Sequence, residues 1–312
     1  MSATGEAGTS AQPASAHRGA PVETPFRRFV AEFLESPVAA IALAVLVVIV
    51  ALALLAPWIA PQNPYDLAQV DVMDNRLPPG STSMMTGMVY LLGTDGAGRD
   101  LVSAMLYGLR ISLAVGVASG LIAMAIGAVV GLVAAYVGGR VETLIMRVVD
   151  LQLSFPAILI ALMLVAVLGK GVDKIIVALI TVQWAYYART VRSSALVERR
   201  KEYVEAARCL GLSHRRILFR HVLPNCLPPL IVVATVQTAH AIALEATLSF
   251  LGVGLPQTEP SLGLLISNGF EYVLSGKYWI STFPGLALLV TIMTINLVGD
   301  QLRDILNPRL KR

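Results

Sequence analysis

The residue types that catalyse reactions or bind metals are few and scattered in this chain. The histidines are His17, His214, His221 and His240, and the cysteines are Cys209 and Cys226. A metal site or a catalytic set needs such groups at short, regular spacings, which these positions lack. The sequence also has no G-x-x-x-x-G-K-[ST] phosphate loop. We therefore expect no enzyme activity, bound metal or cofactor in the chain itself.

A more informative pattern lies in the basic segment between residues 188 and 221. Read as a helix, residues 201–211 place four apolar side chains on one face, at i, i+3, i+4 and i+7. These are Tyr203, Ala206, Ala207 and Leu210, flanked by Glu205. Gly211 stands where a helix can end in the left-handed conformation. The exposed stripe favours docking by another protein. A helix lying on lipid head groups is the alternative, because the segment carries nine basic residues.

Five polar side chains interrupt long apolar stretches. They are Gln183, Gln237, His240, Glu245 and Asn296. Such groups are costly in lipid, so they face a cavity or another helix. We expect His240 and Glu245 to line a cavity, with Gln237 one turn from His240 on the same face. Interhelical hydrogen bonding is the favoured role of Gln183 and Asn296, and a cavity is the alternative.

The elements that position these groups are membrane spans. The chain is 56% hydrophobic and 14% charged, with a mean hydropathy of +0.71, whereas soluble domains carry roughly 25% charged residues. Six apolar runs predict an all-α bundle of six transmembrane helices, each needing about 20 residues. The runs are 38–60, 109–137, 156–168 (with its cytoplasmic end near 141), 172–187, 222–251 and 283–298. Small residues spaced along 112–139 predict close helix packing.

The distribution of Lys and Arg sets the orientation of these spans. The loop at 61–108 has two arginines against five aspartates, whereas the segment at 188–221 and both terminal regions are basic. Basic segments stay on the cytoplasmic side, so both termini are expected inside and the 61–108 loop outside. Glu142, Arg147 and Asp150 are expected to form ion pairs at the cytoplasmic surface.

Longer motifs resemble a known family. Glu205-Ala206-Ala207, followed after three residues by Gly211 and after nine more by 221–225 (HVLPN), resembles the EAA loop of bacterial ABC importer permeases. Where the general pattern has Ile, this chain has His221, as in the dipeptide and oligopeptide branch. The segments 92–100 (LGTDGAGRD), 248–254 and 296–304 are similar to the C-type subunit of peptide permeases. The resemblance covers about residues 29–310.

The resemblance implies a type I ABC importer permease fold in the cell inner membrane. Its domains would be a disordered cytoplasmic tail (1–28), a first span with an extracytoplasmic loop (29–108), and a core permease domain (109–312) with a coupling helix at 201–213. The implied partners are a second permease subunit, two ATPase subunits that bind ATP and Mg²⁺, and an extracytoplasmic binding protein. No nucleic acid is involved.

The implied substrate is a di- or oligopeptide, moving along a pathway lined by the five polar candidates. The alternatives are nickel or another small solute carried by the same machinery, or an ATP-independent secondary transporter. Of four residues before the second span, Thr94, Asp95 and Asp100 are expected to form turns and a helix cap, and all four are candidate contacts for the binding protein. They are Thr94, Asp95, Arg99 and Asp100.

Overall fold

The computed structural model describes residues 25–66 and 69–306 of the chain. Of the tail predicted at 1–28, residues 1–24 lie outside the described residues. Residues 25–28 are not disordered, because they form the start of the first helix. The long helices are α2 (Pro37–Ile59), α3 (Leu101–Val137), α6 (Val172–Glu198), α9 (Leu223–Phe250) and α11 (Trp279–Leu306). The shorter ones are α1 (Pro25–Leu34), α4 (Gly139–Ser154), α5 (Ala157–Leu168), α7 (Glu202–Cys209), α8 (His214–Ile217) and α10 (Leu262–Phe270).

Short elements complete the chain. A π-helical turn, Leu218–Val222, joins α8 to α9, and 3-10 turns occupy Val72–Asp74 and Val273–Ser275. Strands β1 (Ser81–Thr82) and β2 (Val89–Tyr90) form an antiparallel hairpin in register Ser81 to Tyr90.

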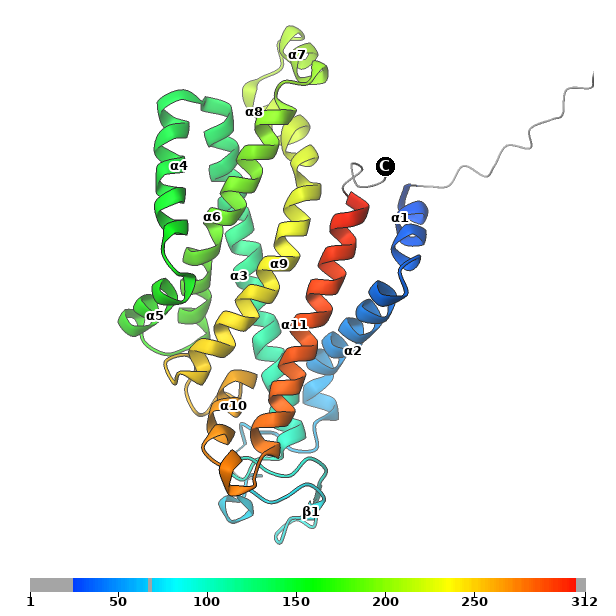
Figure 1. Cartoon of the computed structure of the whole chain (residues 1–312), viewed down its shortest axis with the longest axis vertical. Helices are drawn as coiled ribbons and strands as arrows, with labels where there is room; N and C mark the ends of the chain where they lie inside the picture. Colours follow the sequence, from blue (N-terminus) through cyan, green and yellow to red (C-terminus); the bar gives the residue numbers. More distant parts are fainter. Residues whose placement is uncertain (1–24, 67–68, 307–312) are drawn as a thin grey trace, which may run out of the picture.

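Four helical segments of the described chain are long and apolar enough to cross a membrane: α2, α3, the continuous stretch 214–250 and α11. A fifth is counted if α4 and α5 form one broken span. The all-α membrane fold is therefore confirmed, but the count of six is not reached on this criterion. The predicted span at 172–187 is part of α6, which has 27 residues but is too polar to qualify. It packs along α3 (Figure 1), where polar side chains can be hidden from lipid.

The span predicted at 141–168 is broken in the middle. Helix α4 ends at Ser154, α5 begins at Ala157, and the two are bent by 90°. Phe155 is extended (φ −92°, ψ 143°), because the residue before a proline is disfavoured in helical conformation. Pro156 therefore turns the chain between α4 and α5, and α4 runs beside α6 (Figure 1).

Glycines bring α3 against α6, as the small-residue pattern predicted. A Cβ added at Gly127 would lie 2.5 Å from the carbonyl oxygen of Trp184, and one at Gly131 would collide with the carbonyl of Ala188. Because only glycine fits at both positions, these two backbones touch directly.

The two ends of the bundle differ in what they carry. Figure 1 shows α7 at one end, with α1 and the carboxyl end of α11 directed toward it, while α10 and the β-hairpin lie at the opposite end. This arrangement agrees with the predicted separation of the 188–221 segment from the 61–108 loop.

Candidate functional site

Helix α7 is built by its own sequence, as predicted. Gly211 has φ +71°, its N–H donates to the carbonyl of Arg208 at 2.9 Å, and the N–H of Leu212 donates to the carbonyl of Ala207 at 3.2 Å. These two bonds form a Schellman motif, which satisfies carbonyls that the end of the helix would leave open. Glu202 and Glu205 occupy the first turn, where negative charge complements the helix dipole.

Helix α7 has a buried face and an exposed face, and one of the four side chains predicted on the exposed stripe lies on the buried face. Val204 and Ala207 are 1% and 5% exposed, and they belong to the same buried cluster as Ile217, the last residue of α8. Leu210 is 79% exposed, and Ala206 and Glu205 are also exposed. Ala207 therefore anchors the helix to its own chain rather than standing on the outer face.

Tyr203 ties α7 to two long helices while part of its ring stays exposed. Its hydroxyl donates to Glu198 Oε2 at 2.7 Å and accepts from Asn225 Nδ2 at 3.3 Å. Burial and the Glu198 carboxylate raise the pKa of Tyr203 above its usual value, so the hydroxyl remains a donor at neutral pH. Lys201 Nζ holds the other Glu198 oxygen at 2.6 Å. The end of α6, the start of α9 and α7 are thus joined through one side chain.

Glu245 does not line an open cavity, contrary to the expectation. Its side chain is fully buried, and it accepts hydrogen bonds from Ser112 Oγ at 2.7 Å and Ser249 Oγ at 2.8 Å. Ser112 belongs to α3, so the carboxyl group bonds two helices inside the bundle. A polar group that is satisfied in this way costs far less in the membrane than an unpaired one.

The other four polar candidates are divided by burial. Gln183 and Gln237 are 1% and 5% exposed, and Gln183 Nε2 donates to Ser119 Oγ at 3.4 Å. Asn296 is half-buried, whereas His240 is exposed. Gln237 and His240 therefore do not share an open face, and His240 is the member of the set that stands clear of the bundle.

A charged surface between α4 and α6 was only partly anticipated. We call it the polar seam and define it by four exposed side chains: Arg147, Asp150, Arg189 and Ser193. Arg189 Nη2 and Asp150 Oδ1 form an ion pair at 2.6 Å. A second pair joins Arg192 Nε to Glu142 Oε1 at 2.8 Å. The expected ion pairing is therefore confirmed for Glu142 and Asp150, whereas Arg147 forms no ion pair with a described residue. The helical spacing of polar residues from 186 to 193 was the signal that could have located the seam on α6.

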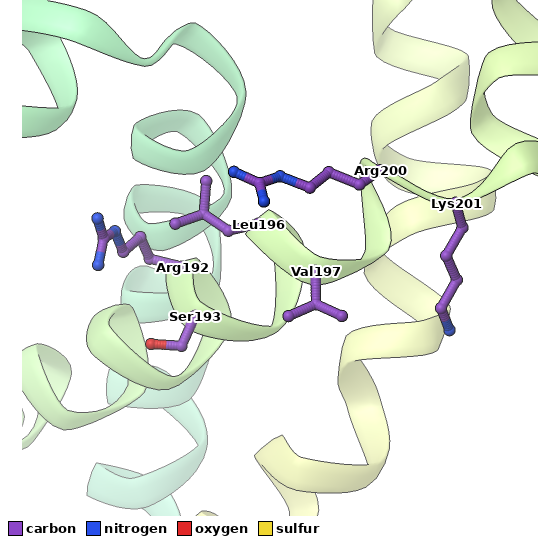
Figure 2. A pocket seen from close by; sticks show the side chains of 6 residues that line it. All are labelled: Arg192, Ser193, Leu196, Val197, Arg200 and Lys201. Carbon is purple, nitrogen blue, oxygen red and sulfur yellow. The ribbon is translucent and has the colours of Figure 1, made fainter.

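One residue of the polar seam, Ser193, also lines a pocket beside the last turns of α6. This pocket has a volume of about 610 Å³, and Figure 2 shows the side chains around it. It is lined by Arg192, Ser193, Leu196, Val197, Arg200 and Lys201. Arg192 and Lys201 are paired with Glu142 and Glu198, which leaves Arg200 as the lining cation without an ion pair among the described residues.

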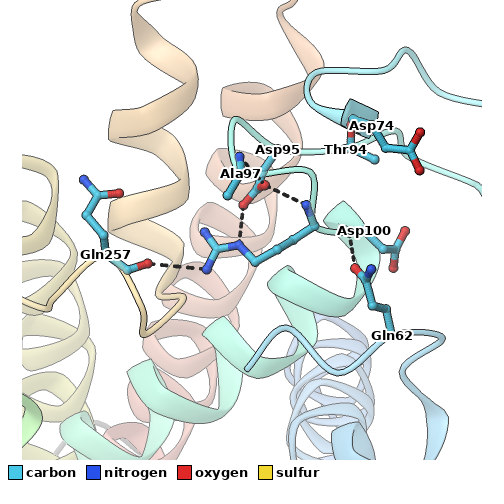
Figure 3. A network of polar contacts seen from close by, with 8 residues as sticks. Gln62, Asp74, Thr94, Asp95, Ala97, Asp100 and Gln257 are labelled. Atoms are coloured by element: carbon cyan, nitrogen blue, oxygen red, sulfur yellow. Dashed lines mark hydrogen bonds and ion pairs between the residues drawn. The ribbon is translucent and has the colours of Figure 1, made fainter. Parts of the chain in front are cut away.

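The four candidate contacts for a binding protein are all buried. Asp95 Oδ2 pairs with Arg99 Nε at 2.7 Å, and Asp95 Oδ1 accepts from the backbone N–H of Ala97 and Arg99 (Figure 3). Arg99 also donates to the Gln257 carbonyl at 3.4 Å. Asp100 is the N-cap of α3 and accepts from the N–H of Ser103 at 2.7 Å. These contacts shape the loop, so the cap prediction is confirmed.

Thr94 completes the same network, since its hydroxyl donates to the carbonyl of Asp74 at 2.5 Å. With exposed fractions of 0–5%, the four side chains do not form a docking surface on this end. Large apolar side chains are among the exposed groups here: Met84 is 95%, Met85 77% and Leu274 100% exposed. No periodic pattern in the sequence indicated these side chains, because they lie at turns.

Metal binding finds no support in the described ranges. Within residues 25–66 and 69–306, no three His, Cys, Asp or Glu side chains are placed to share a metal ion.

Comparison with known families decides the identity. Residues 127–312 match the model of the binding-protein-dependent transport system inner membrane component, and residues 24–79 match the N-terminal transmembrane domain of oligopeptide transport permease C. The chain belongs to this family of transport permeases. It is therefore a multi-pass membrane permease of a transport system.

Curated relatives extend the match over most of the chain. A putative peptide transport system permease protein of Brucella suis is 44% identical over 87% of this chain and 88% of its own length. The dipeptide transport system permease protein DppC of Escherichia coli is 42% identical over 93% and 95%. The di/tripeptide transport system permease protein DppC of Pseudomonas aeruginosa is 37% identical over 92% and 93%.

A solved structure shows the same fold. One chain of the MetNI methionine ABC transporter, in inward-facing conformations, superposes with a TM-score of 0.53 and 21% identity over 65% of this permease and 96% of that chain. The expected ABC importer permease fold is confirmed by this likeness.

Proposed function

We propose that this permease is a transmembrane subunit of an ATP-driven importer of di- and oligopeptides in the cell inner membrane. It pairs with a second permease subunit to enclose the pore. Two ATPase subunits, which bind ATP and Mg²⁺, dock at the α7 end, which is cytoplasmic together with both termini. A binding protein delivers peptide at the opposite end, where α10 and the β-hairpin lie (Figure 1).

The observation that carries the proposal is the exposed face of α7 in a chain of this family. Its apolar side chains have no covering element within the described residues, whereas Val204 on the opposite face is held in the protein core. A helix fixed on one side and apolar on the other suits insertion into a groove of a partner. ATPase closure would push α7, and Tyr203 would pass the movement to both α6 and α9 through Glu198 and Asn225.

Peptide is the favoured substrate because the relatives named above are peptide and dipeptide permeases. Nickel is not favoured by these relatives. A secondary transporter would take its energy from an ion gradient, which does not fit a family of binding-protein-dependent systems.

The test is uptake of a radiolabelled dipeptide by proteoliposomes that contain this permease, its partner permease, the ATPases and the binding protein. Uptake should require internal ATP and the binding protein, and it should be unchanged by an ionophore. Uptake without ATP that collapses with the ionophore would contradict the proposal. ATP-dependent uptake of Ni²⁺ with no uptake of peptide would replace the substrate.

A further inference from the structure

The polar seam is open to its surroundings in spite of its charge. The side chains of Arg189 and Asp150 are 50% and 60% exposed although they are paired. Arg147 stands one turn from Asp150 on α4, and Ser193 stands one turn from Arg189 on α6, both exposed. The seam thus places charged and polar side chains on the exposed surface of two neighbouring helices, which are joined by the Asp150–Arg189 ion pair.

The contacts of neighbouring residues fix the height of the seam along the bundle. Val149 precedes Asp150 and is fully buried against Ala188, which precedes Arg189. Val130 of α3 packs against the same cluster. The ion pair therefore lies at the level of Val130.

That level falls inside the apolar part of α3. Val130 is seven residues before Val137, where α3 ends, and this separation corresponds to about 10 Å along the helix. On either side of Val130, α3 exposes Val129 and Val133, at 51% and 41%. The outer surface of α3 suits hydrocarbon at the same height at which the seam carries an ion pair.

Hydrocarbon does not suit the seam itself. Charged side chains within membrane spans face water-filled cavities or other protein groups, because exposure to lipid costs several kcal/mol. Ser193 also lines the open pocket beside Arg200 and Lys201 (Figure 2), so the seam borders space that is not filled by protein.

We propose that the polar seam is a water-filled inner part of the translocation pathway, where Asp150 and Arg189 exchange their ion pair for the charged ends of a peptide. This inference rests on the proposed function. Arg189 takes the terminal carboxylate and Asp150 the terminal ammonium. A zwitterion supplies one charge of each sign, so neither side chain is left unpaired when the pair opens. The planar guanidinium matches a carboxylate with two parallel hydrogen bonds.

Thiol labelling tests whether the seam is wet. In the assembled transporter in lipid nanodiscs, with Cys209→Ser in this chain, Ser193→Cys is compared with Leu151→Cys. Leu151 follows Asp150 and is 64% exposed on the apolar side of α4. A membrane-impermeant thiol reagent should modify Ser193→Cys at least about tenfold faster, since only a hydrated thiol ionises readily. Saturating dipeptide should slow that reaction. Equal rates, or an unreactive Ser193→Cys covered by the second permease, would overturn the proposal.

A second experiment tests recognition of the carboxylate. Uptake of a dipeptide is compared with uptake of its C-terminal amide, in the wild type and in Arg189→Gln. The preference for the free carboxylate should fall by about tenfold in Arg189→Gln, as expected when one charge-assisted contact is lost. The binding protein is the same in both transporters, so its own selectivity cancels in this ratio. Leu151→Ala, the matched control, should keep the wild-type ratio.

The seam assignment can fail while the proposed function stands. If the wild type imports dipeptide with ATP but Arg189→Gln keeps the full preference, the seam assignment is wrong and the proposed function stands. If the wild type imports no peptide, the proposed function fails, and the seam assignment fails with it.

Discussion

Replacing Leu210 by alanine should weaken ATPase docking without unfolding the permease. The side chain is 79% exposed, and full burial of a leucine contributes about 1.5–3 kcal/mol. Docking that covers the exposed part would recover about 1–2.5 kcal/mol. Its loss should raise the Kd for the ATPase by about 5- to 70-fold. Since the side chain makes little contact within the chain, the thermal midpoint should not move.

Val204→Ala on the other face of α7 is the matched control. Val204 is 1% exposed, so truncation leaves a small cavity that should cost about 1–3 kcal/mol of stability. This variant should lower the thermal midpoint of the permease pair, measured by tryptophan fluorescence. ATPase affinity is measured for both variants by titration onto permease immobilised in nanodiscs. An unchanged Kd for Leu210→Ala would refute the assignment of the outer face of α7 as a docking surface.

Three further substitutions test the packing that positions α7 and the bundle. Gly211→Ala should lower the stability by about 1–2 kcal/mol, measured as a lower thermal midpoint. The cause is backbone strain at φ +71° and not a clash, since nothing lies within 4 Å of the added Cβ. An unchanged midpoint would mean that the helix end relaxes freely. Gly131→Val should lower the stability by at least about 1–3 kcal/mol, because its Cβ would meet the Ala188 carbonyl. A variant that is well folded on size exclusion and has the wild-type thermal midpoint would contradict the close packing. Glu245→Ala leaves buried serine hydroxyls without their acceptor and should lower stability by about 1–3 kcal/mol, whereas equal stability would show that water replaces the carboxylate.

The sequence predicted features that depend on local residue order. The end of α7 at Gly211 follows from a glycine after an apolar periodic run, and the cap of α3 at Asp100 follows from an acidic residue before one. The second span nevertheless begins at Leu101 rather than Leu109, because the cap determines the start of the helix and hydropathy does not. Both features need only the chemistry of neighbouring residues.

Features that depend on which surfaces meet were not predictable in the same way. Periodicity places Ala207 on a stripe with Ala206, but only the packing against Ile217 decides that Ala207 faces inward. Asp95 and Arg99 could equally have formed an external contact or an internal ion pair, since the same side chains serve both roles. Glu245 was expected at a cavity because its three-dimensional serine partner, Ser112, lies 133 residues away.

The most direct test of the central claim is ATP hydrolysis by the reconstituted complex, with and without dipeptide-loaded binding protein. Hydrolysis should rise with dipeptide in the wild type and should lose that response in Glu205→Lys, which reverses an exposed charge on α7. Hydrolysis that is indifferent to dipeptide, or a full dipeptide response in Glu205→Lys, would contradict a peptide importer driven through this helix.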